Sequence, residues 1–282
     1  MRVLITGGSG QLGYDIVKLL EENNTMMYVP THEAMDITDR DSVMMAFYSF
    51  KPDVVFHCAA YTAVDKAEED KERCYDINVN GTKNIVDASN IYGSKVVYIS
   101  TDYVFHGDKN GIYETSDITD PINYYGYTKY LGEQEVMKNS NNLIVRISWV
   151  FGINGKNFVK TMLRLASSRD EISVVSDQVG SPTYTYDLAR LLVDMVNKNK
   201  SGIYQATNEG YCSWYEFAKY IFEVSEIDIR VNPILTKDYV TLAKRPLNSR
   251  LSKDKLDEDG LTRLPDWKDA TKRYIKVLRK EK

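Results

Sequence analysis

The feature that most constrains the fold is a glycine-rich turn close to the N-terminus. Residues 2–6 form an apolar, β-rich run, and apolar side chains recur at helical spacing from Leu12 onward. Between these segments, Gly7, Gly10 and Gly13 occupy every third position. In this strand–turn–helix context, the spacing predicts a turn that binds a dinucleotide pyrophosphate at the helix N-terminus; a purely structural turn is the alternative. The predicted cofactor-binding residues of this turn are Gly7, Gly10, Gln11, Leu12 and Gly13.

Strands and helices alternate regularly up to about residue 150. Further strands are predicted over residues 26–29, 53–57, 95–100 and 143–147. This order predicts an α/β fold with a Rossmann-type doubly wound parallel sheet. Beyond residue 150 the alternation of strands and helices is lost. We therefore divide the chain into an NAD(P)-binding domain over 1–150 and a smaller α/β lobe over 151–282. The lobe is expected to bind mainly substrate and to return some segments to the first domain. Two of its predicted helices begin at residues with a hydroxyl group, Thr185 and Ser213, which we expect to act as N-caps.

The second strand bears on the choice of cofactor. Residues 30–32 follow it, without the acidic residue that usually holds the ribose 2′-hydroxyl of NAD. That omission removes a repulsion against a 2′-phosphate, although no arginine follows to bind this phosphate. The sequence therefore favours NADPH modestly, with NADH also accepted. Asp36, followed by Ile37, is expected to accept a hydrogen bond from the adenine amine.

Small residues follow the strand over 53–57, where a parallel sheet binds its ligands. They let the backbone approach a cofactor, and the predicted contacts are Ala59, Ala60, Tyr61 and Thr62. Asn78 lies on the next long helix. We expect it either to reach back to this loop or to be an exposed polar residue.

Tyr125 and Lys129 are one helical turn apart, which places a phenol and an ammonium group on the same helix face. A tyrosine with a pKa of about 10 is a weak acid near neutrality, and a nearby cation lowers that pKa. Tyr14 and Tyr215 have a lysine at the same spacing, but only Tyr125 follows a strand-end hydroxyl, Thr101. We therefore predict that Tyr125 transfers a proton, that Lys129 lowers its pKa, and that Thr101 binds a substrate oxygen.

A basic segment over residues 244–250 stands out in a chain of net charge −4. Arg245 and Arg250 are suited to bidentate contacts with a diphosphate, with Asn248 between them. A solvated basic loop explains the same composition equally well, so both interpretations stay open from the residues alone.

The composition excludes several classes of protein. The acidic net charge argues against nucleic acid as a partner, and no apolar run approaches the ~20 residues of a membrane span. The sequence opens without a secretory leader. Cys58, Cys74 and Cys212 are too widely spaced for a disulfide framework or a metal motif. We expect a cytoplasmic protein without a membrane partner.

The glycine turn together with Thr101, Tyr125 and Lys129 resembles the extended short-chain dehydrogenase/reductase family. Three further segments are similar to one branch of that family, which reduces a nucleotide-linked keto sugar. These segments are Ala-Val-Asp-Lys-Ala-Glu over 63–68, Thr-Asp-Tyr-Val-Phe over 101–105, and Arg-Pro-Leu-Asn-Ser over 245–249.

The resemblance implies an NAD(P)H-dependent reduction of the C4 ketone of dTDP-4-dehydro-L-rhamnose to dTDP-L-rhamnose, a precursor of surface polysaccharide. Tyr125 would protonate the ketone oxygen, and Lys129 would also hydrogen-bond the nicotinamide ribose. The substrate contacts that it implies are Thr101, Asp102, Trp149, Arg245, Asn248 and Arg250.

The resemblance also leaves alternatives. Some family members hold magnesium between subunits through glutamates that have no match here, so no metal ligand is predicted, and monomer and homodimer both stay open. Related dehydratases need an Asp-Glu pair after the threonine, whereas this chain has Asp102 and Tyr103. Another nucleotide-sugar 4-reductase, an epimerase, or a nucleotide-binding regulatory subunit without turnover remain the rival functions.

Overall fold

A parallel sheet forms the centre of the computed structural model, which describes residues 1–280. Its six strands lie in the order β10-β5-β4-β3-β1-β2, and every neighbouring pair is parallel. The strands are β1 (Arg2–Thr6), β2 (Met26–Tyr28), β3 (Val54–His57), β4 (Lys95–Thr101), β5 (Leu143–Ile147) and β10 (Gly202–Gln205). The predicted Rossmann-type α/β sheet is confirmed.

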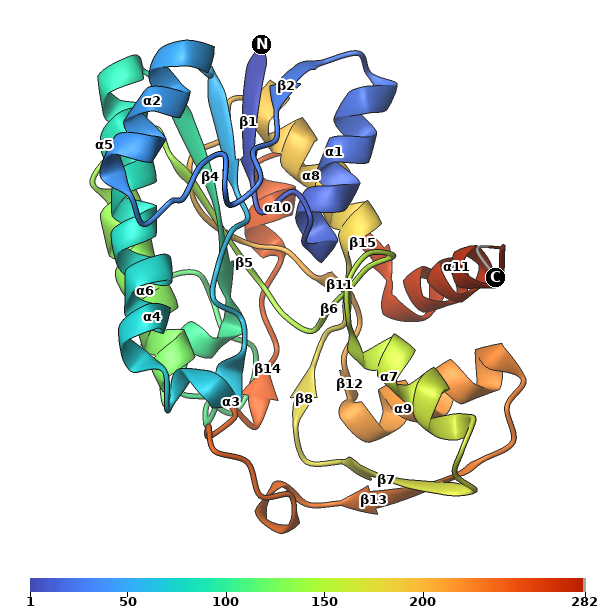
Figure 1. Ribbon diagram of the computed structural model, residues 1–282. Coiled ribbons are helices and arrows are strands. Elements are labelled where there is room, and N and C mark those ends of the chain that lie inside the picture. The colour runs from blue at the N-terminus through green and yellow to red at the C-terminus, as the bar shows by residue number, and fades with distance from the viewer. Residues whose placement is uncertain (281–282) are drawn as a thin grey trace.

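Helices cover both faces of this sheet (Figure 1). On one face lie α1 (Gln11–Glu22) and α8 (Thr185–Asn197); on the other lie α2 (Arg40–Phe50), α5 (Thr82–Tyr92) and α6 (Tyr124–Met137). Successive side chains of β1 point to opposite faces of the sheet: Val3 and Ile5 pack into the core beneath α1 and α8, and Leu4 packs into the core beneath α2 and α5.

Within residues 1–280, no helix has the length and apolar character needed to cross a membrane.

Two elements from beyond residue 150 belong to these layers. β10 pairs with β5 along the sheet edge, and α8 packs beside α1 through apolar residues such as Leu188 and Leu192. The chain therefore returns to the first sheet after leaving it. The division at residue 150 stays a prediction.

A smaller lobe gathers at one end of the sheet (Figure 1). Its core contains Phe151, Phe217 and Tyr274, contributed by three separate stretches of the chain. The larger lobe elements are α7 (Phe158–Ala166), α9 (Trp214–Ser225), α11 (Trp267–Lys280) and the paired strands β7 (Glu171–Val175) and β13 (Arg230–Ile234). The short strands are β6 (Val150–Phe151), β8 (Val179–Gly180), β9 (Thr183–Tyr184), β11 (Asn208–Glu209), β12 (Cys212–Ser213), β14 (Asn248–Ser249) and β15 (Leu264–Asp266).

Short helical segments complete the fold. Before α5, the chain forms α3 (Val64–Ala67), α4 (Lys71–Tyr75) and a π-helical segment, η1 (Asp76–Gly81). The remaining segments are the 3₁₀ turns η2 (Asp102–Val104) and η3 (Thr236–Asp238) and the helix α10 (Asp254–Glu258).

The two predicted N-caps have different outcomes. Ser213 caps α9 in a reciprocal capping box with Glu216, as its hydroxyl predicted. The N-cap of α8 is Tyr184, so the prediction for Thr185 is wrong. The Thr185 hydroxyl is fully buried and donates instead to the Asp15 carboxylate on α1. A buried carboxylate without a hydrogen bond is costly, and the Thr185 hydroxyl supplies the one that Asp15 needs.

A buried ion pair fixes α6 against the sheet. Arg146 of β5 donates from Nε and Nη2 to the two carboxylate oxygens of Glu133 at 2.9 and 2.7 Å. Both side chains are buried, and the guanidinium also donates to Thr115 O at 3.3 Å. The pair sets the position of the helix that carries Tyr125 and Lys129.

Removing only one member of this pair is expected to destabilise the protein strongly. Glu133→Leu leaves the Arg146 charge buried without its partner, a cost of about 3 to 5 kcal/mol. The double variant Glu133→Leu/Arg146→Met is the matched control, because it removes both charges and keeps the volume. Urea denaturation measures both losses; an equal loss in the single and the double variant would contradict the prediction.

Candidate active site

A cavity of about 1250 Å³ opens at the carboxyl ends of the strands. It lies where the strand order reverses between β1 and β3, the place at which open α/β sheets bind ligands. Ligand pockets commonly measure roughly 300 to 1,000 Å³, so this cavity has room for a dinucleotide and a second ligand.

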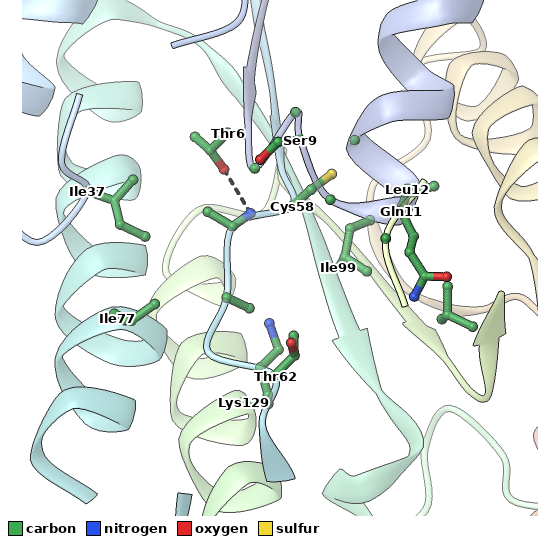
Figure 2. Close-up of a pocket in the computed structure, with 18 of the residues that line it drawn as sticks. Thr6, Ser9, Gln11, Leu12, Ile37, Cys58, Thr62, Ile77, Ile99 and Lys129 are labelled. Carbon is green, nitrogen blue, oxygen red and sulfur yellow. Dashed lines mark hydrogen bonds between the residues drawn. The ribbon is translucent and has the colours of Figure 1, made fainter. Parts of the chain in front are cut away.

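The glycine turn after β1 forms one wall of the cavity. Gly7 has φ +67°, and an added Cβ would lie 2.7 Å from Ala59 N. A Cβ at Gly13 would lie 2.2 Å from Gly7 O, so the helix packs tightly on the turn. Ala59 N–H donates to Thr6 Oγ1 at 3.1 Å, which ties the turn to the loop after β3 (Figure 2).

His57 continues that connection into the core. Thr82 Oγ1 donates to Asn78 O, so it accepts from His57 Nε2 at 3.1 Å, and His57 Nδ1 then accepts from Thr6 Oγ1 at 2.8 Å. Burial lowers the pKa of His57 to about 3. The neutral ring is therefore a structural link between the glycine turn and the core.

Asn78 reaches back to the loop after β3, which is one of the two positions predicted for it. Its Oδ1 accepts from Tyr61 N at 2.8 Å, and its Nδ2 donates to Tyr61 O and to Thr128 Oγ1 at 3.2 and 3.0 Å. The Tyr61 hydroxyl donates to Asp70. Neither Asn78 nor Tyr61 lines the cavity, whereas Ala59, Ala60 and Thr62 do.

The expected adenosine end of the cavity includes residues 30–33 and 36–38. Asp36 Oδ1 accepts from Thr38 N and Thr38 Oγ1 at 2.9 and 2.8 Å, which fixes the carboxylate beside buried Ile37. The His32 ring lies 3.9 Å from the same oxygen. None of the described residues that line this end of the cavity is an arginine. The sequence after the second strand likewise offers no arginine for a 2′-phosphate.

Thr101, Tyr125 and Lys129 line the same cavity, whereas Tyr14 and Tyr215 are not among its described lining residues. Thr101 ends β4; its hydroxyl donates to Asp102 Oδ1 at 3.0 Å and accepts from Tyr103 N. Tyr125 lies in the first turn of α6, and Lys129 projects from the same helix into the cavity (Figure 2). The structure thus selects one of the three tyrosine–lysine pairs.

Gly126 lets α6 approach the strand end closely. A Cβ at this position would lie 2.2 Å from Tyr103 O. The contact brings the Tyr125 ring edge-on to Tyr103, with ring centroids 5.7 Å apart. A side chain at position 126 would therefore move Tyr125 away from Thr101.

Burial dominates the protonation of the site. It raises the pKa of Tyr125, and the Asp102 charge raises it further. Burial lowers the pKa of Lys129 to about 7, and the ammonium lies over the Tyr98 ring, 3.9 Å from its centroid. We expected Lys129 to lower the pKa of Tyr125, but in this cavity the net direction is opposite. A partly neutral lysine is a weak source of positive potential, and desolvation of the phenol is larger.

Asp102 and Trp149 also line the cavity. Trp149 has φ +48°, which is rare for a bulky residue. Its indole stacks on Trp214 of α9, with centroids 3.7 Å apart and planes 14° apart. Trp214 gave no sequence signal, because its partner lies far away along the chain.

Arg245, Asn248 and Arg250 are not among the described lining residues. Arg245 forms a two-pronged ion pair with Asp65, with nitrogen–oxygen distances of 3.1 and 2.7 Å. Asn248 Nδ2 donates to Lys109 O and to Gly111 O, both at 2.7 Å, and Asn248 Oδ1 accepts from Arg250 Nε at 2.8 Å. Arg245 and Asn248 thus join distant segments of the protein, whereas the Arg250 contact is local.

Across residues 1–280, no group of three or more His, Cys, Asp or Glu side chains is arranged to hold a metal ion. Cys58, Cys74 and Cys212 are all free thiols. Whether magnesium joins two copies of the chain stays an open prediction.

Replacing Asp102 with asparagine is expected to alter how stability depends on pH. Burial raises the pKa of Asp102 from 3.8 to about 6. Between these values the folded protein binds more protons than the unfolded protein, so the wild-type free energy of unfolding falls as pH rises, by on the order of 3 kcal/mol. Urea denaturation from about pH 4 to about pH 7 should show Asp102→Asn gaining this amount relative to wild type. A constant difference between the two proteins would contradict it.

Comparison with known proteins gives a consistent result. The family model described as the RmlD substrate binding domain matches residues 1–280. A dTDP-4-dehydrorhamnose reductase from Aggregatibacter actinomycetemcomitans is 43% identical over 285 residues, covering 96% of this chain and 97% of that protein. The spore coat polysaccharide biosynthesis protein SpsK of Bacillus subtilis is 39% identical over 275 residues, covering 97% and 96%. The crystal structure of dTDP-4-dehydrorhamnose reductase from Bacillus anthracis in complex with NADP has a TM-score of 0.95 and 41% identity, covering 98% of this chain and 99% of that one.

Proposed function

The chain belongs to the RmlD substrate binding domain family, and from that premise we propose that it reduces the C4 ketone of dTDP-4-dehydro-L-rhamnose to dTDP-L-rhamnose. The motif resemblance to the reductase branch is thereby confirmed. The chain is an NAD(P)H-dependent oxidoreductase of dTDP-sugar and polysaccharide biosynthesis. The observation that carries the proposal is that Thr101, Tyr125 and Lys129 line one cavity with the glycine turn.

The cofactor side of the cavity suits NADPH. Gly7, Gly10 and Gly13 leave the backbone free to approach a pyrophosphate, and Gln11 and Leu12 begin the helix whose N–H groups would face it. Asp36 and Ile37 would hold the adenine end, and residues 59, 60 and 62 would line the path between. When bound, the reduced nicotinamide supplies a hydride to the ketone carbon. Use of NADH as well stays a prediction.

The chain's own residues would handle the ketone oxygen. Thr101 would orient this oxygen by a hydrogen bond, and Tyr125 would give it a proton as negative charge develops. The raised pKa keeps the Tyr125 phenol protonated until that moment. Lys129, with a pKa near 7, can hold or release a proton at neutral pH, so we propose that it returns one to Tyr125 after transfer. It would also bind the nicotinamide ribose.

Substrate recognition is proposed on the lobe side. Asp102 would accept a hydrogen bond from a sugar hydroxyl, and the Trp149 indole would pack against the sugar or the nucleotide. Substrate contacts by Arg245, Asn248 and Arg250 stay predictions, since each of these side chains is engaged by protein atoms.

Tyr103 favours simple reduction over elimination of water. It occupies the position at which dehydratases carry a glutamate, and burial raises the pKa of its phenol. A protonated phenol is a poor base for removing a proton from carbon.

The cytoplasmic location and the monomeric or homodimeric state stay predictions. The three free thiols suit a reducing compartment.

Tyr125→Phe is expected to lower kcat by at least roughly a hundredfold, the scale of lost general-acid catalysis. NADPH binding, followed by fluorescence titration, should be largely preserved because the ring stays in place. Tyr215→Phe is the matched control, since it removes a phenol from the same spacing outside the described cavity lining. Near-normal turnover by Tyr125→Phe would refute the assigned mechanism.

NADPH oxidation with dTDP-4-dehydro-L-rhamnose, made in place by upstream enzymes, tests the function itself. We expect turnover with this substrate and at most weak turnover with the corresponding UDP and GDP sugars. Stoichiometric consumption of added NADPH would exclude an epimerase, which regenerates its cofactor in each cycle. NADPH binding without turnover of any sugar would favour a regulatory nucleotide-binding subunit.

A further inference from the structure

The first turn of α6 is held by a side chain that does not line the cavity. Glu68, the C-cap residue directly after α3, accepts a hydrogen bond from Tyr124 N at 2.8 Å through its Oε1 atom. Tyr124 is the first residue of α6, and Tyr125 is the second. The contact therefore lies one residue from the proposed proton donor.

A helix start is where such a contact has the most effect. The first N–H groups of a helix have no partner within the helix, so the first turn frays unless another group binds them. A carboxylate is well suited, because its charge also interacts favourably with the positive end of the helix. Asn123 provides a second support, since its Oδ1 accepts from Gly126 N at 2.8 Å.

The short helix that presents Glu68 is itself fastened to the C-terminal part of the chain. Asp65, one turn earlier, accepts from Ala243 N at 3.2 Å and from both terminal nitrogens of Arg245 at 3.1 and 2.7 Å. Asn123 Nδ2 donates to Lys244 O at 2.8 Å. Residues 243–245 thus bind both α3 and the N-cap of α6.

We propose that Glu68 is a positioning residue for Tyr125, and that Asp65 keeps Glu68 in place by anchoring α3 to Arg245. This inference rests on the proposed reduction and adds two residues that do not line the described cavity. In this arrangement Glu68 fixes where α6 begins, and the start of α6 fixes the distance from Tyr125 to the ketone oxygen.

Glu68→Ala is expected to lower kcat by about tenfold or more, because small misplacements of a reacting group are costly. The KM for the keto sugar and the dissociation constant for NADPH should change by less than about threefold, since no binding contact is removed. The solvent deuterium isotope effect on kcat should rise, because a displaced Tyr125 makes proton transfer limit the rate. Loss of folded protein alone would lower the active fraction without altering that isotope effect.

Three further variants sharpen the test. Glu68→Gln keeps an oxygen that can accept the N–H and should recover most of kcat, whereas Glu68→Asp keeps the charge but is too short and should not. Glu69→Ala is the matched control, because its exposed side chain is adjacent in sequence. If Glu68→Ala fails to fold, Glu68→Asp decides the same question.

Wild-type kcat and isotope effect in Glu68→Ala, or in Glu68→Asp, would overturn the proposal. So would a Glu68→Gln variant as impaired as Glu68→Ala, because the hydrogen-bond acceptor would then not be the determining feature. Absence of turnover in the wild-type protein would instead refute the proposed function, so the two failures are distinguishable.

Discussion

The hydrogen bond from Ala59 N–H to Thr6 Oγ1 connects the two strand ends between which the order of the sheet reverses. The cavity depends on this contact, because β1 leads into the glycine turn and β3 leads into the loop that faces it. The glycine turn and the loop after β3 lie so close together that Gly7 has no room for a side chain. Through His57 and Thr82 the same connection reaches the backbone of η1. A displacement of either wall would therefore leave several buried polar groups without partners, at a cost of about 1 to 3 kcal/mol for each.

Burial of its titratable side chains is the second determinant of the site. Burial shifts Tyr125, Lys129 and Asp102 towards their neutral forms, so all three favour a state with fewer charges. Such a pocket resists the charge separation that ketone reduction requires. In the proposed mechanism, a proton from Tyr125 that arrives together with the hydride would avoid a free alkoxide, and a proton from Lys129 would avoid a lasting phenolate. Concerted movement of protons would therefore suit the proposed mechanism, because it leaves no separated charge among these buried groups.

The sequence predicted features that depend on short spacings. Gly7, Gly10 and Gly13 are close along the chain, and so are Tyr125 and Lys129; the alternation of strands and helices placed both groups at the same sheet edge. The direction of the Tyr125 pKa shift could not be predicted in this way, because it depends on burial by several elements together. Thr185 shows the same limit, since its hydroxyl is drawn to Asp15, a residue 170 positions away.

Long-range contacts also explain why the basic segment was ambiguous. Arg245 and Asp65 are 180 positions apart, and a list of residue types cannot distinguish a guanidinium awaiting a phosphate from one already paired with a carboxylate. Both residues belong to segments that resemble the reductase branch, and in the fold these segments meet beside the start of α6. A branch-specific motif can therefore reflect the support of the helix that carries the proposed proton donor, as well as contact with the substrate. Because the same contacts join the C-terminal segment to the start of the helix that carries Tyr125, a change in one can alter the position of the other.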